Sequence, residues 1–248
     1  MDSVIRQYAF TEYSDAADTA TIKYMSLRGL MLGEEGLDRT YIKVIFQPDL
    51  KETVMVAGFP GAGGVGIAAA NLLVEFLGAN LFAELYSPLF PDYTPVDSDG
   101  VCSLLKYSFF VSTENRLVIL VGEEQPPPDE IPAYYELCGD ILDFVEKLNC
   151  ITILTVDGIP SMYPQRDIYV AGTSKRLIVD CVDMGARVYT GERIIGLSGL
   201  LLGLAKLREI SGACILSTVT NIISDDEAAF NSYRFLRRIL RLGLEKTI

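Results

Sequence analysis

Short apolar runs alternate with segments of helical periodicity along most of the chain. The apolar runs are rich in β-branched residues and are bounded by polar or glycine residues, which predicts buried strands. They lie at residues 41–46, 53–57, 81–86, 117–121, 151–156, 168–171 and 213–219. Strands that alternate with helices build α/β folds, so we predict a mixed, largely parallel sheet flanked by helices.

Two further segments extend this pattern. Residues 101–111 predict another strand, joined to the next one by a hairpin loop at residues 112–115, so part of the sheet is antiparallel. Residues 22–32 predict a first strand, with its turn at residues 33–36.

The helical segments carry their own start signals. Along residues 133–148 an apolar face recurs at helical spacing, and Thr173 or Ser174 can cap the helix that ends near residue 185. We predict helices at residues 67–77, 133–148, 174–185 and 194–207.

The last helix has the clearest start. Ser224-Asp-Asp-Glu227 predicts a capping box. Behind it run two apolar rows, Ala229, Tyr233, Leu236 and Leu240, and then Phe235, Ile239 and Leu242. One row can cover the core, so we predict that the second meets a partner and that the protein is a homo-oligomer.

Length and charge set the domain organisation and the class of partner. Residues 1–21 are rich in acidic side chains and are predicted to form a mobile lead-in, and residues 22–248 are predicted to form a single α/β domain. The formal net charge of -12, from 33 acidic and 21 basic residues, argues against nucleic acid as a partner.

The chain has no histidine, which excludes Ser-His-Asp and Cys-His catalysis and histidine-containing zinc sites. Its five cysteines include no C-x-x-C pair, so we expect reduced thiols and no metal site. No catalytic constellation emerges. We therefore predict a protein that is not an enzyme and needs no cofactor.

Membrane insertion is not expected. The longest uncharged apolar run, residues 194–205, is shorter than the roughly 20 residues that span a bilayer, and the first residues carry no signal pattern. We expect a soluble, cytoplasmic protein.

A glycine-rich turn follows the strand at residues 53–57, with the sequence Gly58-Phe-Pro-Gly-Ala-Gly-Gly-Val-Gly66. Gly61, Gly63 and Gly66 have the G-x-G-x-x-G spacing that cradles a pyrophosphate, and Glu84 lies where an acid binds a ribose hydroxyl. This pattern predicts a dinucleotide site.

The same turn has a structural interpretation. Pro60 interrupts the path from the strand into Gly61, and Gly64-Val65 stands where a P-loop has Lys-Ser or Lys-Thr. Glycines at such a junction also permit positive φ and close helix–sheet packing. Both interpretations, ligand loop and structural loop, stay open for Gly58, Pro60, Gly61, Gly63, Gly64, Gly66 and Glu84.

Further motifs follow the glycine turn in a fixed order. Asp157-Gly158 is interpreted as the turn that closes a buried strand. The others are Glu84-Leu-Tyr-Ser-Pro-Leu-Phe-Pro91, Gly122-Glu-Glu-Gln-Pro126, Gly196-Leu-Ser-Gly-Leu-Leu-Leu-Gly203 and Ser224-Asp-Asp-Glu-Ala-Ala229. In this order and spacing, residues 53–240 resemble the proteasome assembly chaperone family, in the branch of the second eukaryotic chaperone and its archaeal relatives.

The resemblance implies an α/β sandwich similar to purine nucleoside phosphorylase, without that enzyme's activity. It also implies homo-oligomers that bind proteasome α-type subunits. Some family members end in a hydrophobic-Tyr-any tripeptide that docks between α subunits, whereas this chain ends in Lys246-Thr247-Ile248. We therefore expect another face, or a second assembly subunit, to make the contact.

Two segments are candidate contact surfaces. The loop with Tyr86, Pro88 and Phe90 is either a partner contact or a rigid cover over one end of the sheet. The glycines of residues 196–203 permit close approach of a backbone, from a second subunit or from the same chain. The alternative functions are a nucleotide-binding enzyme and an oligomeric scaffold of unrelated role.

Overall fold

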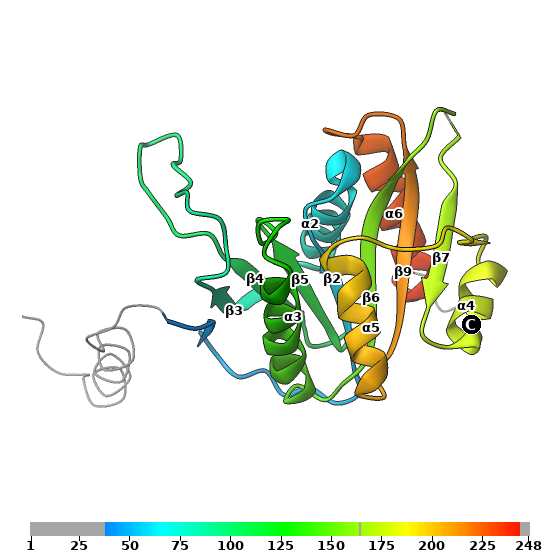
Figure 1. Ribbon diagram of the computed structural model, residues 1–248. Helices are drawn as coiled ribbons and strands as arrows, with labels where there is room; N and C mark the ends of the chain where they lie inside the picture. Colours follow the sequence, from blue (N-terminus) through cyan, green and yellow to red (C-terminus); the bar gives the residue numbers. More distant parts are fainter. Residues whose placement is uncertain (1–37, 164, 244–248) are drawn as a thin grey trace, which may run out of the picture. The chain divides into compact units, whose positions relative to one another are not determined.

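A nine-stranded sheet organises the part of the chain that the computed structural model describes, residues 38–163 and 165–243 (Figure 1). The strand order is β1-β3-β4-β5-β2-β6-β9-β7-β8. The strands are β1 Tyr41–Val44, β2 Thr53–Gly58, β3 Asn80–Tyr86, β4 Tyr107–Ser112, β5 Leu117–Gly122, β6 Cys150–Pro160, β7 Ile168–Gly172, β8 Arg187–Val188 and β9 Ser211–Val219.

Parallel pairing is concentrated at the centre of the sheet. β5, β2, β6 and β9 are parallel neighbours, whereas β1, β3, β4 and β5 pair antiparallel, and so do β9 and β7. The central strands are buried almost throughout, as expected where helices cover both faces of a sheet. The predicted mixed α/β sheet flanked by helices is confirmed.

Helices cover both faces of the sheet (Figure 1). On one face, α3 (Ile131–Glu146) and α5 (Leu197–Leu207) pack on a core that includes Phe82, Phe109 and Ile153. On the other face, α2 (Val65–Leu77) and α6 (Asp226–Ile239) pack on a core that includes Val56, Ile119 and Ile215. The short helix α4 (Lys175–Asp183) lies against β7, β8 and β9.

Two predicted strand boundaries are wrong. The strand expected at residues 101–111 begins at Tyr107, because pairing with β3 and β5 starts there, whereas Val101 and Leu104 are exposed. Asp157-Gly158 is not a turn. It lies within β6, which continues to Pro160 because β9 pairs with it along that whole length.

One predicted helix cap is confirmed and the other is wrong. The Ser174 hydroxyl accepts a hydrogen bond from the Leu177 N–H at 3.3 Å and caps α4. At the start of α6 the cap is Asp225, whose carboxylate accepts from the Ala228 N–H at 3.1 Å. Ser224 is exposed and lies one residue before the cap.

The second apolar row of α6 does not form a free surface. Phe235 and Leu242 are buried, and Ile239 packs against the same core. The reason is that α6 lies against α2 as well as against β9, so both rows have neighbours within the chain. The prediction that this row meets a partner is wrong.

The predicted lead-in, the strand at residues 22–32, its turn and the tail Lys246–Ile248 lie outside the described residues. Among those described, no helix combines the length and apolarity needed to cross a membrane. The same residues contain no cluster of three or more Cys, Asp and Glu side chains suited to a metal ion. Four of the five cysteines are buried and unpaired, and Cys102 is exposed.

Candidate functional site at the carboxyl ends of the central strands

The glycine turn leaves β2, passes through a short 3-10 turn at Ala62–Gly64 and enters α2. Gly63 and Gly64 have φ values of 68° and 61°, in the left-handed region that glycine adopts without strain. A Cβ on Gly66 would lie 2.6 Å from the carbonyl oxygens of Phe59 and Val156. These glycines therefore allow the start of α2 to pack backbone to backbone on the sheet.

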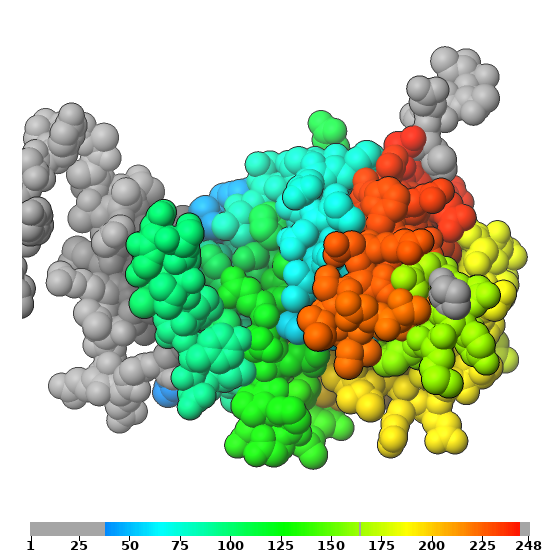
Figure 2. Space-filling model, turned by 90° about the horizontal axis from the view of Figure 1, so that it is seen from above, coloured from blue at the N-terminus to red at the C-terminus, as the bar shows by residue number. Residues whose placement is uncertain are grey.

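The loop between β9 and α6, residues 220–225, lies on the glycine turn. The Gly63 N–H donates to the Ile222 carbonyl at 2.7 Å, and the Asp225 N–H donates to the Gly63 carbonyl at 2.9 Å. Figure 2 looks down on the carboxyl ends of the central strands and shows the two segments, cyan and orange, against each other. A phosphate-binding turn directs its N–H groups at the ligand. Here Gly63 uses its N–H within the chain, which favours the structural interpretation.

Glu84 lies away from the glycine turn, because β4 and β5 separate β3 from β2. Its carboxylate accepts hydrogen bonds from Lys106 at 2.6 Å and from Lys43 at 3.2 Å. Burial favours the neutral carboxyl, but the two lysines outweigh it and lower the pKa of Glu84. The prediction that Glu84 and the glycine turn face one dinucleotide is therefore wrong.

Asp157 is a buried carboxylate beside the glycine turn. Asp157 lies on β6, so close to Gly61 that a Cβ added to Gly61 would strike the Asp157 carboxylate. The carboxylate accepts a hydrogen bond from the Gly158 N–H at 2.7 Å. Burial nevertheless raises the pKa of Asp157 to about 6. The Asp-Gly pair predicts a turn here, whereas the residue lies within β6.

Gln125 joins three of the sequence motifs. Its side-chain N–H donates to the Pro60 carbonyl of the glycine turn, and its Oε1 accepts from the Leu197 N–H at 3.1 Å, at the start of α5. Gly196, with φ of 85°, leaves room for the Gln125 amide. The motif Gly122–Pro126 does not by itself mark Gln125, although a polar residue just past a buried parallel strand is a usable signal.

Four exposed apolar side chains stand beyond this edge, on two neighbouring loops. They range from 65% exposed at Ile222 to 95% at Met162, and the others are Tyr163 and Ile223. The loops leave adjacent strands, and the Ser161 N–H donates to the Val219 carbonyl at 2.8 Å. We call these four side chains the apolar rim. Sequence analysis missed it, although adjacent isoleucines in a polar loop were the available signal.

Comparison with known proteins shows which family shares this fold and its motifs. The model of the PAC2 family matches residues 55–247. The chain belongs to the PAC2 family. The family resemblance predicted from the motifs is confirmed.

Three relatives of this PAC2-family chain are informative. PbaB of Pyrococcus furiosus, an archaeal proteasome activator, is 32% identical, with a TM-score of 0.77 over 84% of this chain and 91% of PbaB. PbaA of the same organism, an archaeal homolog of proteasome-assembly chaperone, is 21% identical, with a TM-score of 0.70 over 83% and 87%, which shows the shared fold. The uncharacterized protein MJ1210 of Methanocaldococcus jannaschii is 28% identical over 73% of this chain and 70% of its own.

In the PAC2-family chain, the predicted contact loop lies at the end of β3, away from the apolar rim. Pro88 is exposed, whereas Tyr86 and Phe90 are half-buried. The ring of Phe90 packs on that of Tyr107, with centroids 4.8 Å apart. Phe90 therefore helps to cover the sheet, and Pro88 is the residue of this loop that faces outward.

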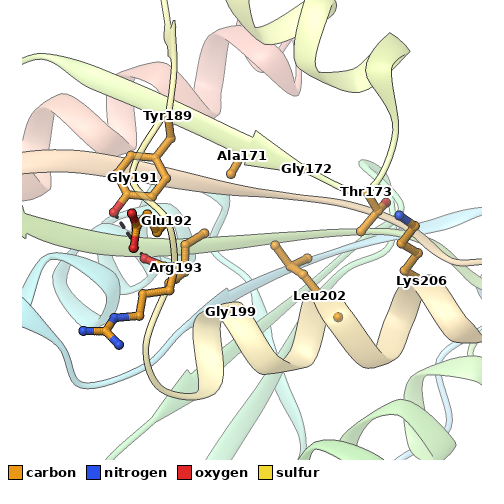
Figure 3. A pocket seen from close by; sticks show the side chains of 12 residues that line it. Ala171, Gly172, Thr173, Tyr189, Gly191, Glu192, Arg193, Gly199, Leu202 and Lys206 are labelled. Atoms are coloured by element: carbon orange, nitrogen blue, oxygen red, sulfur yellow. Dashed lines mark hydrogen bonds between the residues drawn. The ribbon is translucent and has the colours of Figure 1, made fainter.

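A cavity of about 330 Å³ lies between α5, the end of β7 and residues 189–194 (Figure 3). Thr173 and Lys206 lie side by side at one end, and the Arg193 side chain points away at the other. The Thr173 hydroxyl already accepts a hydrogen bond from the Gly212 N–H at 2.8 Å. The charged groups of this PAC2-family cavity thus do not converge on one point, as a small-molecule site requires.

Proposed function

We propose that this protein is a non-enzymatic assembly chaperone that binds proteasome α-type subunits and acts as a homo-oligomer. Its membership of the PAC2 family and its likeness to PbaB, an archaeal proteasome activator, support this function. The structural observation that carries the proposal is that the glycine turn holds residues 220–225 through backbone hydrogen bonds of Gly63. We call this holding site the socket. The turn holds the loop that bears Ile222 and Ile223, where an enzyme would hold a nucleotide.

The socket fixes the loop before any partner arrives. Besides the two bonds to Gly63, the Asp225 carboxylate accepts from the Thr220 N–H at 2.9 Å, and Asn221 Oδ1 accepts from the Ile223 N–H at 3.0 Å. A loop that is already ordered loses little conformational entropy on binding, and exposed apolar side chains on it are typical of protein contacts. The apolar rim is therefore the contact surface that we propose for the α-type subunit.

The charges around the rim indicate the chemistry of the client surface. Asp226 and Glu227 are exposed and follow Ile222 and Ile223 closely in the chain, Glu227 pairs with Arg166 at 3.5 Å, and the whole chain carries a net charge of -12. A matching surface has an apolar cleft with basic residues at its edge.

Size-exclusion chromatography with light scattering tests the function, using the protein alone and mixed with cognate proteasome α-type subunits. We expect a defined oligomer that moves into a larger complex. No complex, either with α subunits alone or with a co-encoded second assembly subunit added, would remove the proposed function and leave an oligomeric scaffold as its replacement.

Ile223→Glu tests the contact surface. A charge in the centre of an apolar contact should weaken the complex about tenfold or more. Val179→Glu on α4 is the matched control, because Val179 is also an exposed apolar residue but lies away from the rim. Equal binding by the wild type and Ile223→Glu would place the contact elsewhere, with Pro88 as the next candidate.

A further inference from the structure

A second apolar surface lies on the helices α3 and α5, which run side by side on one face of the sheet (Figure 1). We call it the α3–α5 face and define it by Ile131, Tyr135, Ile195, Gly203 and Leu207. The four larger side chains range from 54% exposed at Tyr135 to 80% exposed at Leu207. A groove of about 440 Å³ between the two helices is lined by Ile131, Tyr135, Ile195 and Gly203, and Leu207 lies one helical turn beyond it on α5.

No contact within the chain requires a glycine at position 203 of this face. A Cβ on Gly203 would meet nothing within 4 Å, although glycine weakens a helix relative to alanine. Its neighbour Gly199 is different, because a Cβ there would lie 2.5 Å from the Ile194 carbonyl oxygen. Gly199 thus serves packing within the chain, and the open position at Gly203 points to a contact from outside it.

Charge indicates which partner fits the face. Two copies of a chain with a net charge of -12 repel each other wherever their charged surfaces meet. The five residues of the α3–α5 face are uncharged. At the far end of α5, Arg208 forms ion pairs with Asp143 at 2.5 Å and Glu146 at 3.3 Å, which compensate its charge and leave one negative charge over. The apolar centre of the face therefore adds no charge repulsion of its own between two copies, although Glu130, Glu136 and Lys206 beside it in the chain are exposed.

The face is also self-complementary. Gly203 and Leu207 lie one helical turn apart on α5, so one helix carries both a hole and a knob. When two copies of α5 cross about a two-fold axis, Leu207 of each copy fits against Gly203 of the other. The four large side chains expose on the order of 500 Å² per copy, against about 800 Å² per partner in a stable interface. The half-buried Leu200 and Tyr134 in the same groove extend it further.

We propose that two copies of this chain meet through the α3–α5 face, with α5 crossing α5 between Gly203 and Leu207. This assigns a surface to the homo-oligomer of the proposed function and rests on that part of it. It does not depend on the identity of the client, because the apolar rim lies at a different place on the chain.

Gly203→Arg is the decisive variant, measured by light scattering over a dilution series of the protein alone. A Cβ at this position meets nothing within 4 Å in the monomer and arginine favours the helix, but its long side chain blocks a second copy. We expect the wild type to be oligomeric and the variant to lose at least half of that mass, with an unchanged or raised Tm. Leu207→Glu should have the same effect, and Val179→Arg on α4 is the matched control.

A wild-type protein that stays monomeric at tens of micromolar, or Gly203→Arg and Leu207→Glu variants that keep the wild-type mass, would overturn the inference. Mixing with α-type subunits separates this result from the proposed function. An oligomer that dissociates in the variants but ignores α subunits keeps the interface and removes the client. A monomer that binds α subunits does the reverse.

Discussion

Asp157 shows how one buried side chain gives the protein a pH dependence. Its pKa is raised from 3.8 to about 6, because burial beside the glycine turn disfavours the charged carboxylate. The folded state therefore binds this proton more tightly than the unfolded state. The contribution of Asp157 to stability is largest below about pH 4 and is lost as the pH rises through about 6.

Asp157→Asn should remove this loss of folding stability at higher pH. Asparagine keeps an oxygen that can accept the Gly158 N–H but carries no charge, so the variant should be more stable than the wild type at pH 7.5, by at most about 3 kcal/mol. Urea unfolding between pH 4 and 8 measures the difference. A variant whose stability falls with pH as steeply as that of the wild type would show that another group is responsible.

Two helical glycines should respond to alanine with opposite signs. Gly66→Ala forces a Cβ against the Phe59 and Val156 carbonyls, and it should destabilise the fold by roughly 3 kcal/mol. Gly203→Ala meets nothing in the monomer and should stabilise an isolated chain by about 1 kcal/mol. Urea unfolding at concentrations below the oligomer's dissociation constant tests both, and equal effects would contradict the packing described at Gly66.

At the scale of elements, Asp225 links a loop to a helix. It caps α6, anchors residues 220–225, and pairs with Arg166 at 3.2 Å. Asp225→Ala should lose about 2 to 3 kcal/mol and speed hydrogen exchange in this loop. Ser224→Ala is the control and should change little, because Ser224 is not the cap. If Ser224→Ala were the more damaging change, the capping box expected from sequence would be restored.

The elements differ in how well the sequence predicted them. The central strands were predictable, because fully buried runs are apolar throughout. The start of β4 was not, since Val101 and Leu104 are apolar yet exposed, and periodicity does not report exposure. The candidate site was predictable only in part: spacing marked the glycine turn, but the strand order that separates Glu84 from it, and the loop that lies on Gly63, arise from tertiary packing.

At the scale of the whole molecule, the two proposed interfaces should respond to salt in opposite ways. Client binding through a rim flanked by Asp226 and Glu227 should weaken on the order of tenfold between about 0.05 M and about 0.5 M salt. Association of two copies through the uncharged α3–α5 face should hold or strengthen, because salt screens the repulsion between chains of net charge -12. Light scattering and a binding titration over the same salt series measure both. Parallel responses would contradict the separation of the two surfaces.

The bond between the Gly63 N–H and the Ile222 carbonyl uses backbone atoms alone. The anchor of the loop is therefore indifferent to which side chains occupy positions 222 and 223. Evolution can exchange this dipeptide, and so change what the protein recognises, while the scaffold beneath it stays the same. A library randomised at positions 222 and 223 should consist mostly of folded members. The loop is therefore a suitable site for selecting variants that bind new partners.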